Sequence, residues 1–375
     1  MSKKISANAA AMIVTTVLLL TINAAAWFSE PLMDIYHSYI FHPTAEILSH
    51  ITGHLPFSVG EIMIIIGILL VIAAPFVFII SAVRKKKKAL KAAGTVYAWV
   101  LIFILFTETM NCFILYHTTP LTDRLAEVSY SHSPDDFSSD EVVGLCGEMI
   151  ECANELAPGL RRDDKGNIIL PGDMGMTARQ SFERMELFPE LRGYSPLPKR
   201  ISFSILMTQL DLQGIYFPFS LEGNYNAELS PARVPNTVIH ELCHVKGFIR
   251  EDEATFLACL ACFESDIPEV RYSGYISAMN YLFAEAVRCA PEEDVYRLRC
   301  MLTEQVAKDN TFVSPEFEKV VEEKAVLPTE TVSEMSETAR DTTLKVNGVE
   351  DGDKSYDRMT TLLLIYRYGI TGRPL

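Results

Sequence analysis

Three residues in the second half of the chain have the types and the spacing of a metal-dependent hydrolytic site. His240, Glu241 and His244 form the pattern H-E-x-x-H. Residues four apart on a helix lie one turn above each other on the same face, so both imidazoles can reach one metal ion. Glu241 follows the first histidine directly, where its carboxylate can take a proton from water at the metal. The pattern therefore predicts two metal ligands and a general base.

A helix with two solvent-facing histidines would give the same pattern by chance, and the neighbouring residues argue against it. The positions around the histidines are mostly apolar: Val238, Ile239, Leu242, Cys243 and Val245. This composition predicts a buried helix over residues 236–247, with Pro235 in or near its first turn. A buried pair of imidazoles needs a polar partner, and a metal ion would be one.

A third ligand is expected soon after this helix. A catalytic zinc usually has three protein ligands and one position open to water. Gly247 can end the helix and turn the chain back, and the acidic residues Glu251, Asp252 and Glu253 follow. Glu251 is the first candidate for the third ligand and Glu253 is the second. The alternative role of these carboxylates is to complement the dipole at the start of the next helix.

The same segment carries a resemblance to a known family. HELCHVKGFIREDEATFLA resembles the zinc-site segment of an uncharacterised bacterial membrane protein family, the domain of unknown function numbered 3810. The resemblance extends to PFSVGEI at 56–62, GIYFPFSLEGNYN at 214–226 and NGVEDGDKSYDRM at 347–359, and so covers most of the chain. It implies a gluzincin-type zinc metallopeptidase of unknown substrate.

The resemblance also bears on the third ligand. In gluzincins that ligand opens a Glu-x-x-Ala helix, a pattern that Glu251 to Ala254 matches and that Glu253 does not. Those relatives often carry Asp, Asn or Glu directly after the alanine. Thr255 occupies this position here, which implies a weaker or different hydrogen bond to a zinc ligand.

Before this segment the chain is dominated by three apolar runs, at about 9–28, 60–83 and 92–115. Each is long enough to cross a bilayer, which takes about twenty apolar residues. We therefore predict a membrane region over residues 1–117 and one domain over residues 118–375. The alternative for the first run is a cleavable signal peptide, with Lys3, Lys4 and Ala24-Ala25-Ala26 as its features. The length of the run favours an uncleaved span.

Basic residues predict the orientation of these spans. Lys3 and Lys4 precede the first run, residues 28–60 contain no Lys or Arg, and RKKKKALK occupies residues 84–91. Lys and Arg stay on the cytoplasmic side. We therefore expect a multi-pass cell-membrane protein with its N-terminus and residues 84–91 in the cytoplasm and residues 118–375 outside. A formal net charge of -15 argues against nucleic acid as a partner, and anionic lipid suits the lysine run better.

Two stretches of the membrane region contain polar residues of open role. His37, His42, His50 and His54 lie in the loop between the first two runs. They could bind a metal, although a helix lying against the membrane surface is the favoured interpretation. Glu108 and Asn111 stand one turn apart in the third run, where a polar pair is costly and marks a candidate site without an assigned role.

Several elements of the domain can also be predicted. Residues 214–226 have strand character, and an edge strand beside a zinc helix could pair with an extended substrate; an ordinary hairpin is the alternative. The polar residues 326–351 predict a loop and a short helix. On the last helix, at 355–368, Tyr356 and Arg358 could approach the site. The cysteines allow two disulfides, Cys146–Cys152 and Cys289–Cys300, or free thiols.

These observations predict a multi-pass membrane protein with an α+β, mainly helical, zincin-like extracytoplasmic domain. We expect His240, His244 and Glu251 to bind zinc and Glu241 to act as the base in the hydrolysis of a peptide or protein substrate at the membrane. The alternative is a non-catalytic, membrane-anchored binding or assembly factor. A structural metal there would need a fourth protein ligand, with Asp252 or Glu253 as the candidates.

Overall fold

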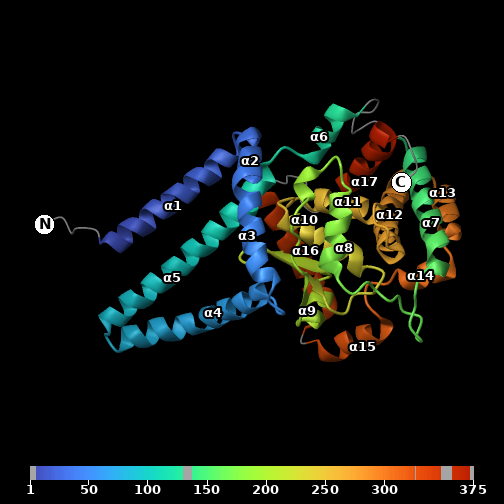
Figure 1. Cartoon of the computed structure of the whole chain (residues 1–375). Helices are drawn as coiled ribbons and strands as arrows, with labels where there is room; N and C mark the ends of the chain where they lie inside the picture. The colour runs from blue at the N-terminus through green and yellow to red at the C-terminus, as the bar shows by residue number, and fades with distance from the viewer. Residues whose placement is uncertain (1–5, 130–136, 326, 348–356, 372–375) are drawn as a thin grey trace.

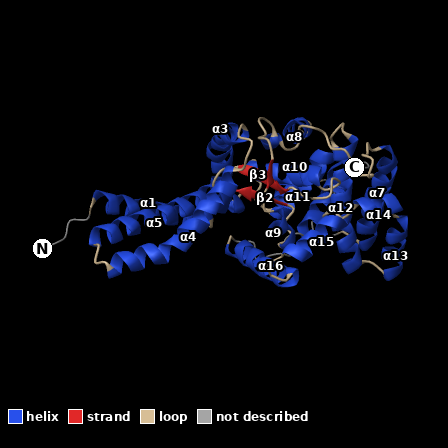
Figure 2. Cartoon of the chain, turned by 90° about the horizontal axis from the view of Figure 1, so that it is seen from below, coloured by secondary structure: helices blue, strands red, loops and turns tan. Residues whose placement is uncertain are grey.

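The computed structural model describes residues 6–129, 137–325, 327–347 and 357–371 and is mainly helical (Figures 1 and 2). Three long helices project from a larger helical body that contains one small sheet. The projecting and junction helices are α1 (Ala7–Ala26), α2 (Glu30–Tyr36), α3 (His42–Gly53), α4 (Val59–Val83) and α5 (Lys87–Glu108). The body contains α6 (Leu121–Val128), α7 (Ser139–Leu156), α8 (Met174–Glu183), α9 (Ser204–Gln209), α10 (Val234–Val245), α11 (Glu251–Phe263), α12 (Pro268–Cys289), α13 (Glu292–Met301), α14 (Glu304–Asp309), α15 (Pro315–Lys324), α16 (Thr329–Val346) and α17 (Asp357–Leu364).

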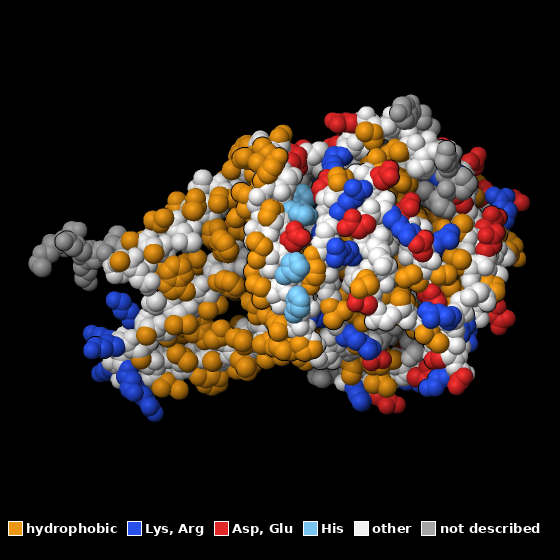
Figure 3. All heavy atoms as spheres, in the orientation of Figure 1, with side chains coloured by type: hydrophobic (Ala, Val, Ile, Leu, Met, Phe, Trp, Pro, Cys, Tyr) orange, Lys and Arg blue, Asp and Glu red, His pale blue; other side chains and the backbone are white. Residues whose placement is uncertain are grey.

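The three projecting helices are long and apolar enough to cross a membrane, as the three apolar runs predict. They are α1, α4 and the helical stretch that starts with α5 and continues to Val128. Hydrophobic side chains cover their visible surface, and a group of Lys and Arg side chains lies at the end away from the body (Figure 3). The turn between α4 and α5 contains Lys85 and Lys86, so the basic loop and the body lie at opposite ends of these helices.

A bent helical segment crosses the inner ends of the three projecting helices. It consists of α2, the π-helical turn η1 (His37–Phe41) and α3. The Nε2 atom of His37 lies 2.9 Å from the carbonyl oxygen of Lys246, and Nε2 of His42 lies 2.9 Å from that of Glu190. The ring of His50 stacks on Tyr194. Three of the four histidines in this region thus attach the segment to the body.

The sheet has three short strands, β1 (Lys199–Ile201), β2 (Gly214–Phe217) and β3 (Glu222–Asn226), in the order β1-β3-β2. β1 pairs with β3 in parallel, and β2 pairs with β3 antiparallel, with Gly214 opposite Tyr225 and Phe217 opposite Glu222. The predicted strand character of residues 214–226 is therefore confirmed as a hairpin. β2 forms one edge of the sheet and packs against α10.

The core of the body lies between α7, α10, α11 and α12, where α12 packs on the other three. Every residue of α11 from Asp252 to Cys262 is buried. A capping box starts α7, because the Ser138 side chain accepts from the N–H of Glu141 and the Glu141 side chain accepts from the N–H of Ser138. These helices form the frame that holds α10 and α11 in place.

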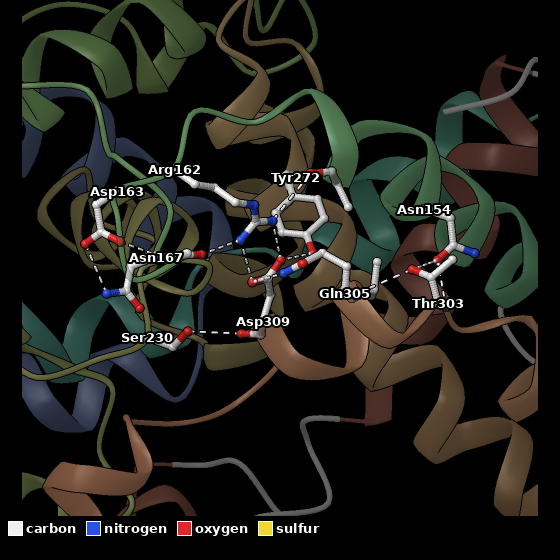
Figure 4. A network of polar contacts seen from close by, with 12 residues as sticks. Asn154, Arg162, Asp163, Asn167, Ser230, Tyr272, Thr303, Gln305 and Asp309 are labelled. Atoms are coloured by element: carbon white, nitrogen blue, oxygen red, sulfur yellow. Dashed lines mark hydrogen bonds and ion pairs between the residues drawn. The ribbon is translucent and has the colours of Figure 1, made fainter.

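A polar network ties this frame together away from the sheet (Figure 4). The carboxylate of Asp309 accepts two hydrogen bonds from Arg162, at 2.9 and 2.7 Å, one from Tyr272 at 2.8 Å and one from Gln305 at 3.0 Å. Ser230 donates to the carbonyl oxygen of Asp309. The network connects the loop after α7, α12, α14 and the loop before α10, and every oxygen of the carboxylate is used.

One expectation for the body is wrong, and of the two alternatives for the cysteines the structure has the free thiols. Residues 329–346 form an 18-residue helix, α16, and not a short one. Only Val332 and Leu344 of this helix are buried, so its apolar stripe is too narrow to stand out in a polar stretch. All eight cysteines are unbridged, and the two possible disulfides Cys146–Cys152 and Cys289–Cys300 do not form.

Candidate metal centre

Three side chains from α10 and α11 converge on one point. The ligand atoms of His240, His244 and Glu251 all lie within 4.8 Å of one another, and we call these three residues the ligand cluster. Nε2 of His240 is 3.2 Å from one oxygen of Glu251, and Nε2 of His244 is 3.7 Å from the other. Two ligands of a tetrahedral zinc ion, each about 2.1 Å from it, are about 3.4 Å apart. The cluster therefore has the dimensions of a three-ligand metal site.

The other nitrogen of each imidazole is held away from this point. Nδ1 of His244 donates to the carbonyl oxygen of Phe248 at 2.7 Å. Nδ1 of His240 lies 3.2 Å from the hydroxyl oxygen of Thr255. Such bonds fix the tautomer and orientation of a metal-binding histidine. Thr255 stands where the relatives often carry Asp, Asn or Glu, and its hydroxyl is the group beside the candidate ligand His240.

Gly247 makes this arrangement possible. Its φ of +99° is in the left-handed region, and the amide of Phe248 bonds back to the carbonyl of Cys243, which ends α10. The turn brings the Phe248 carbonyl back under the ring of His244 and leads the chain into α11. A Cβ atom at residue 247 would also meet the ring of His37 at 2.4 Å. The glycine is needed for both reasons.

The three acidic residues at the start of α11 have different partners. Only Glu251 belongs to the ligand cluster. Glu253 accepts hydrogen bonds from the amide of Leu121 and from Arg250. Asp252 accepts a hydrogen bond from Arg358 at 2.8 Å. The guanidinium of Arg358, which was expected to approach the site, is therefore bound to Asp252. Tyr356 lies outside the described residues.

Glu241 is buried beside the cluster and has an unused oxygen. Its Oε2 atom has no hydrogen-bond partner among the described residues. Two glycines of the sheet make room for the side chain: a Cβ at Gly214 would lie 2.3 Å from Oε1 of Glu241, and one at Gly223 would lie 3.1 Å from its Cβ. Burial raises the pKa of this carboxyl to about 8. A carboxyl group with a pKa near neutral can both take up and release a proton, and Glu241 lines the cleft in front of the ligand cluster.

The ionised carboxylate of Glu251 favours the binding of a cation in the ligand cluster. Burial alone would lower the pKa of His244, but the adjacent Glu251 outweighs burial and raises it to about 9. Burial likewise opposes ionisation of Glu251, yet the two imidazoles hold its pKa well below its usual range. The carboxylate thus requires positive charge next to it, which a metal ion supplies when the imidazoles are neutral.

The cluster opens into a cleft of about 1100 Å³. His240 and Glu251 are partly exposed there, with 15% and 27% of their side-chain surface accessible. Strand β2 forms one wall and α16 another, while Glu108, Cys112 and Tyr116 come from the third apolar helix. Space for a ligand therefore lies directly in front of the three donor atoms.

Sequence reasoning missed some residues of this site. Tyr281 of α12 lines the cleft, its hydroxyl bonds with Thr255, and burial raises its pKa to about 12. It thereby supports the hydroxyl next to His240. Glu108, which the sequence marked as a candidate site without an assigned role, lines the cleft as well. Both residues are far from α10 in sequence, so no local pattern could have placed them there.

The fold and the site together define a mainly helical protein with three apolar, membrane-length helices and a candidate metal centre at their inner ends. The chain belongs to the family described as Protein of unknown function (DUF3810), whose model matches residues 36–364. No curated protein and no solved structure matches the chain.

Proposed function

We propose that this protein is a membrane-anchored zinc metallopeptidase with a zincin-like domain of the gluzincin type. One observation carries the proposal: His240, His244 and Glu251 meet within 4.8 Å beside a buried glutamate that has a free oxygen. A mixed nitrogen and oxygen donor set of this kind suits zinc. A zinc ion held there would supply Lewis acidity, which polarises a carbonyl group and makes water more acidic.

The chain's own residues would perform the proton transfers. Glu241 accepts a proton from the water that adds to the peptide carbonyl carbon. When the carbon–nitrogen bond breaks, the same carboxyl gives that proton to the leaving amine. Gly214 and Gly223 keep the carboxyl in place, and Thr255 and Phe248 hold the two imidazoles. The open edge of β2 lies in the cleft, where an extended peptide can pair with it.

The alternative function, a binding factor with a structural metal, receives less support from the contacts. A structural zinc needs a fourth protein ligand. Asp252 is paired with Arg358, and Glu253 with Arg250 and the Leu121 amide, so neither candidate faces the cluster. The fourth position is left to water or substrate.

We also propose that the membrane region is multi-pass and that the body is extracytoplasmic. The basic α4–α5 turn and the ligand cluster lie at opposite ends of the apolar helices, which supports opposite sides of the membrane. By the distribution of Lys and Arg, the side with the basic turn is the cytoplasm.

The test is cleavage by the purified full chain in detergent with zinc added, using casein and a peptide library. We expect Glu241→Gln to keep its zinc and to lose about 10³-fold in rate, since a general base contributes about 10² to 10⁴. Glu293→Gln makes the same chemical change on the exposed surface of α13 and is the control. Equal cleavage by wild type and Glu241→Gln would remove Glu241 as the base. Bound zinc without cleavage by any variant would favour the binding factor.

A further inference from the structure

The candidate metal centre lies next to the end of the third apolar helix. Past α5 the helix continues as the π-helical turn η2 (Thr109–Phe113). Within it, Asn111 donates to the carbonyl of Pro218 at 2.7 Å and accepts at its own carbonyl from the hydroxyl of Tyr216 at 3.3 Å. The ring of Tyr216 in turn lies 6.0 Å from that of His244. A single side chain therefore separates the apolar helix from the ligand cluster.

The second apolar helix meets the sheet in the same place. The amide of Gly60, in the first turn of α4, donates to the carboxylate of Glu222 on β3 at 2.9 Å. The Phe217 ring on β2 packs so closely that a Cβ at Gly60 would lie 2.0 Å from it. The end of β2 at Phe217 and Pro218 thus rests on the ends of two apolar helices.

Exposed apolar side chains mark where the lipid surface would lie. On α5 the last exposed apolar side chain is Phe106, and no residue from Thr107 to Pro120 is exposed. The segment from α2 to α3 has one face on the body and an opposite face of exposed apolar side chains toward the projecting helices (Figure 3). That face consists of Leu32, Ile35, Tyr39, Ile40, Ile47, Leu48 and Ile51. With no Lys or Arg between residues 28 and 60, it is suited to the boundary between head groups and acyl chains.

The free edge of β2 can pair with an added strand, and antiparallel addition, the more stable pairing per residue, gives that strand a definite direction. The carbonyl of Gln213 accepts from the amide of Asn226 and that of Phe217 accepts from Leu221, so these residues face β3. By alternation, Gly214 and Tyr216 direct their N–H and C=O groups to the open edge in the cleft. A strand added antiparallel to β2 starts near Pro218, at the apolar helices, and runs toward Gly214, beside Glu241.

On this geometry, and resting on the proposed function, we propose that the substrates are membrane-anchored polypeptides that are cut just after a membrane-spanning segment. The anchor lies on the N-terminal side of the scissile bond. The four residues of β2 cover about 13 Å, so the cut falls roughly three to six residues beyond the lipid surface. The apolar face of α2 and α3 rests on the lipid and so fixes the distance between the cleft and the lipid surface.

The experiment uses the full chain in liposomes and a peptide that the soluble assay shows to be cleaved. The peptide is fused, through a Gly-Ser spacer of about four or about twenty residues, to a single apolar span placed either before or after it. The free peptide is the third substrate. The two anchored fusions with equal spacers have the same effective concentration at the membrane. Any difference between their cleavage rates therefore reports whether the span must come before or after the scissile bond.

We expect the fusion with the span before the site and the short spacer to be cleaved about tenfold faster than the fusion with the span after it, and faster than the free peptide. The long spacer should remove this preference. Equal rates for the two directions, or no gain over the free peptide, would overturn the inference while leaving the peptidase intact. If no substrate is cleaved faster by wild type than by Glu241→Gln, the proposed function itself fails.

A double variant tests the role of α3. Ile47→Asp with Ile51→Asp puts charge on the apolar face and leaves the cleft unchanged, and Tyr296→Asp changes an equally exposed residue on α13. We expect only the double variant to lose the preference for the anchored substrate, with free-peptide cleavage unchanged in both. A preference that survives the double variant would contradict the placement of α3 on the lipid.

Discussion

Two carboxyl groups in this molecule, those of Asp309 and Glu241, have opposite surroundings. Asp309 accepts four side-chain hydrogen bonds, two of them from Arg162, and links four parts of the body. Glu241 has an oxygen without a partner among the described residues and faces a cleft. Two glycines replace the side chains that would otherwise fill the space around it.

A free oxygen alone does not mark a reactive carboxylate, because Glu190, Glu222 and Asp252 also have one without a partner among the described residues. Of these four residues only Glu241 lines the cleft. A saturated carboxylate stabilises the fold and has no free lone pair toward a ligand. An unsaturated buried carboxylate costs stability and is retained where chemistry needs it. Both side chains have little exposed surface, so burial alone does not identify the site. The predictions below separate the two roles by measuring metal binding, stability and rate independently.

The largest expected effect is on metal binding. Glu251→Gln replaces an anionic ligand with a neutral amide in the ligand cluster. We expect the zinc dissociation constant to rise at least about 100-fold, since loss of a mere supporting partner already costs 10- to 100-fold. Zinc titration with a competing chelator measures it. Glu253→Gln, two residues on, should keep wild-type affinity, and equal loss in both variants would move the third ligand away from Glu251.

The next effect concerns stability alone. Asp309→Asn leaves Arg162 without its charged partner in a site where both side chains are largely buried, at 18% and 9% exposure. We expect a loss of about 2 to 3 kcal/mol in the free energy of unfolding, seen as a fall of roughly 5 to 10 °C in the melting temperature. Zinc affinity and rate per folded molecule should stay unchanged. A selective loss of activity without loss of stability would refute the structural role.

A change at Gly214 should lower the rate of cleavage and leave the number of zinc ions bound per chain unchanged. A Cβ at this position would lie 2.3 Å from Oε1 of Glu241, so Gly214→Ala displaces the base without touching a ligand. We expect kcat to fall about 10- to 100-fold. Gly172→Ala, which meets nothing within 4 Å, is the matched control. Wild-type kcat in Gly214→Ala would show that the glycine cradle does not position the base.

The smallest effect should come from Thr255. Thr255→Ala removes the hydroxyl beside Nδ1 of His240 and leaves all three ligands in place. We expect zinc affinity to fall about tenfold, as measured by chelator competition, and Thr255→Ser to restore most of it. If serine fails to restore affinity, packing of the threonine methyl group and not its hydroxyl supports the site.

The parts of this molecule that the sequence predicts are those with short-range patterns. Three apolar runs predict three membrane-length helices, and the apolar and aromatic residues 215–219 predict strand character where the hairpin of β2 and β3 forms. His240, His244 and Glu251 come together because one helix turn and one glycine turn relate them. Helix geometry implies that only one of Glu251 and Glu253 faces the histidines, because residues two apart are rotated by about 200°, and the resemblance to the Glu-x-x-Ala pattern implied Glu251.

The rest depends on contacts between distant residues. Tyr281 and Glu108 reach the cleft from α12 and from the third apolar helix, and no sequence spacing connects them to α10. The length of α16 is hidden because only two of its side chains are buried. The histidines of the α2–α3 segment could equally have bound a metal by their type alone. Their contacts with Lys246, Glu190 and Tyr194 instead attach this segment to the body.

The most direct test of the account is X-ray absorption at the zinc edge on the purified, zinc-loaded full chain. We predict one zinc per chain, with two imidazole nitrogens and oxygen ligands at about 2.0 to 2.2 Å and no sulfur. The imidazole signal should disappear in a His240→Ala, His244→Ala double variant. A zinc coordinated by sulfur, or an unchanged spectrum in that variant, would contradict the claim that His240, His244 and Glu251 form the metal centre.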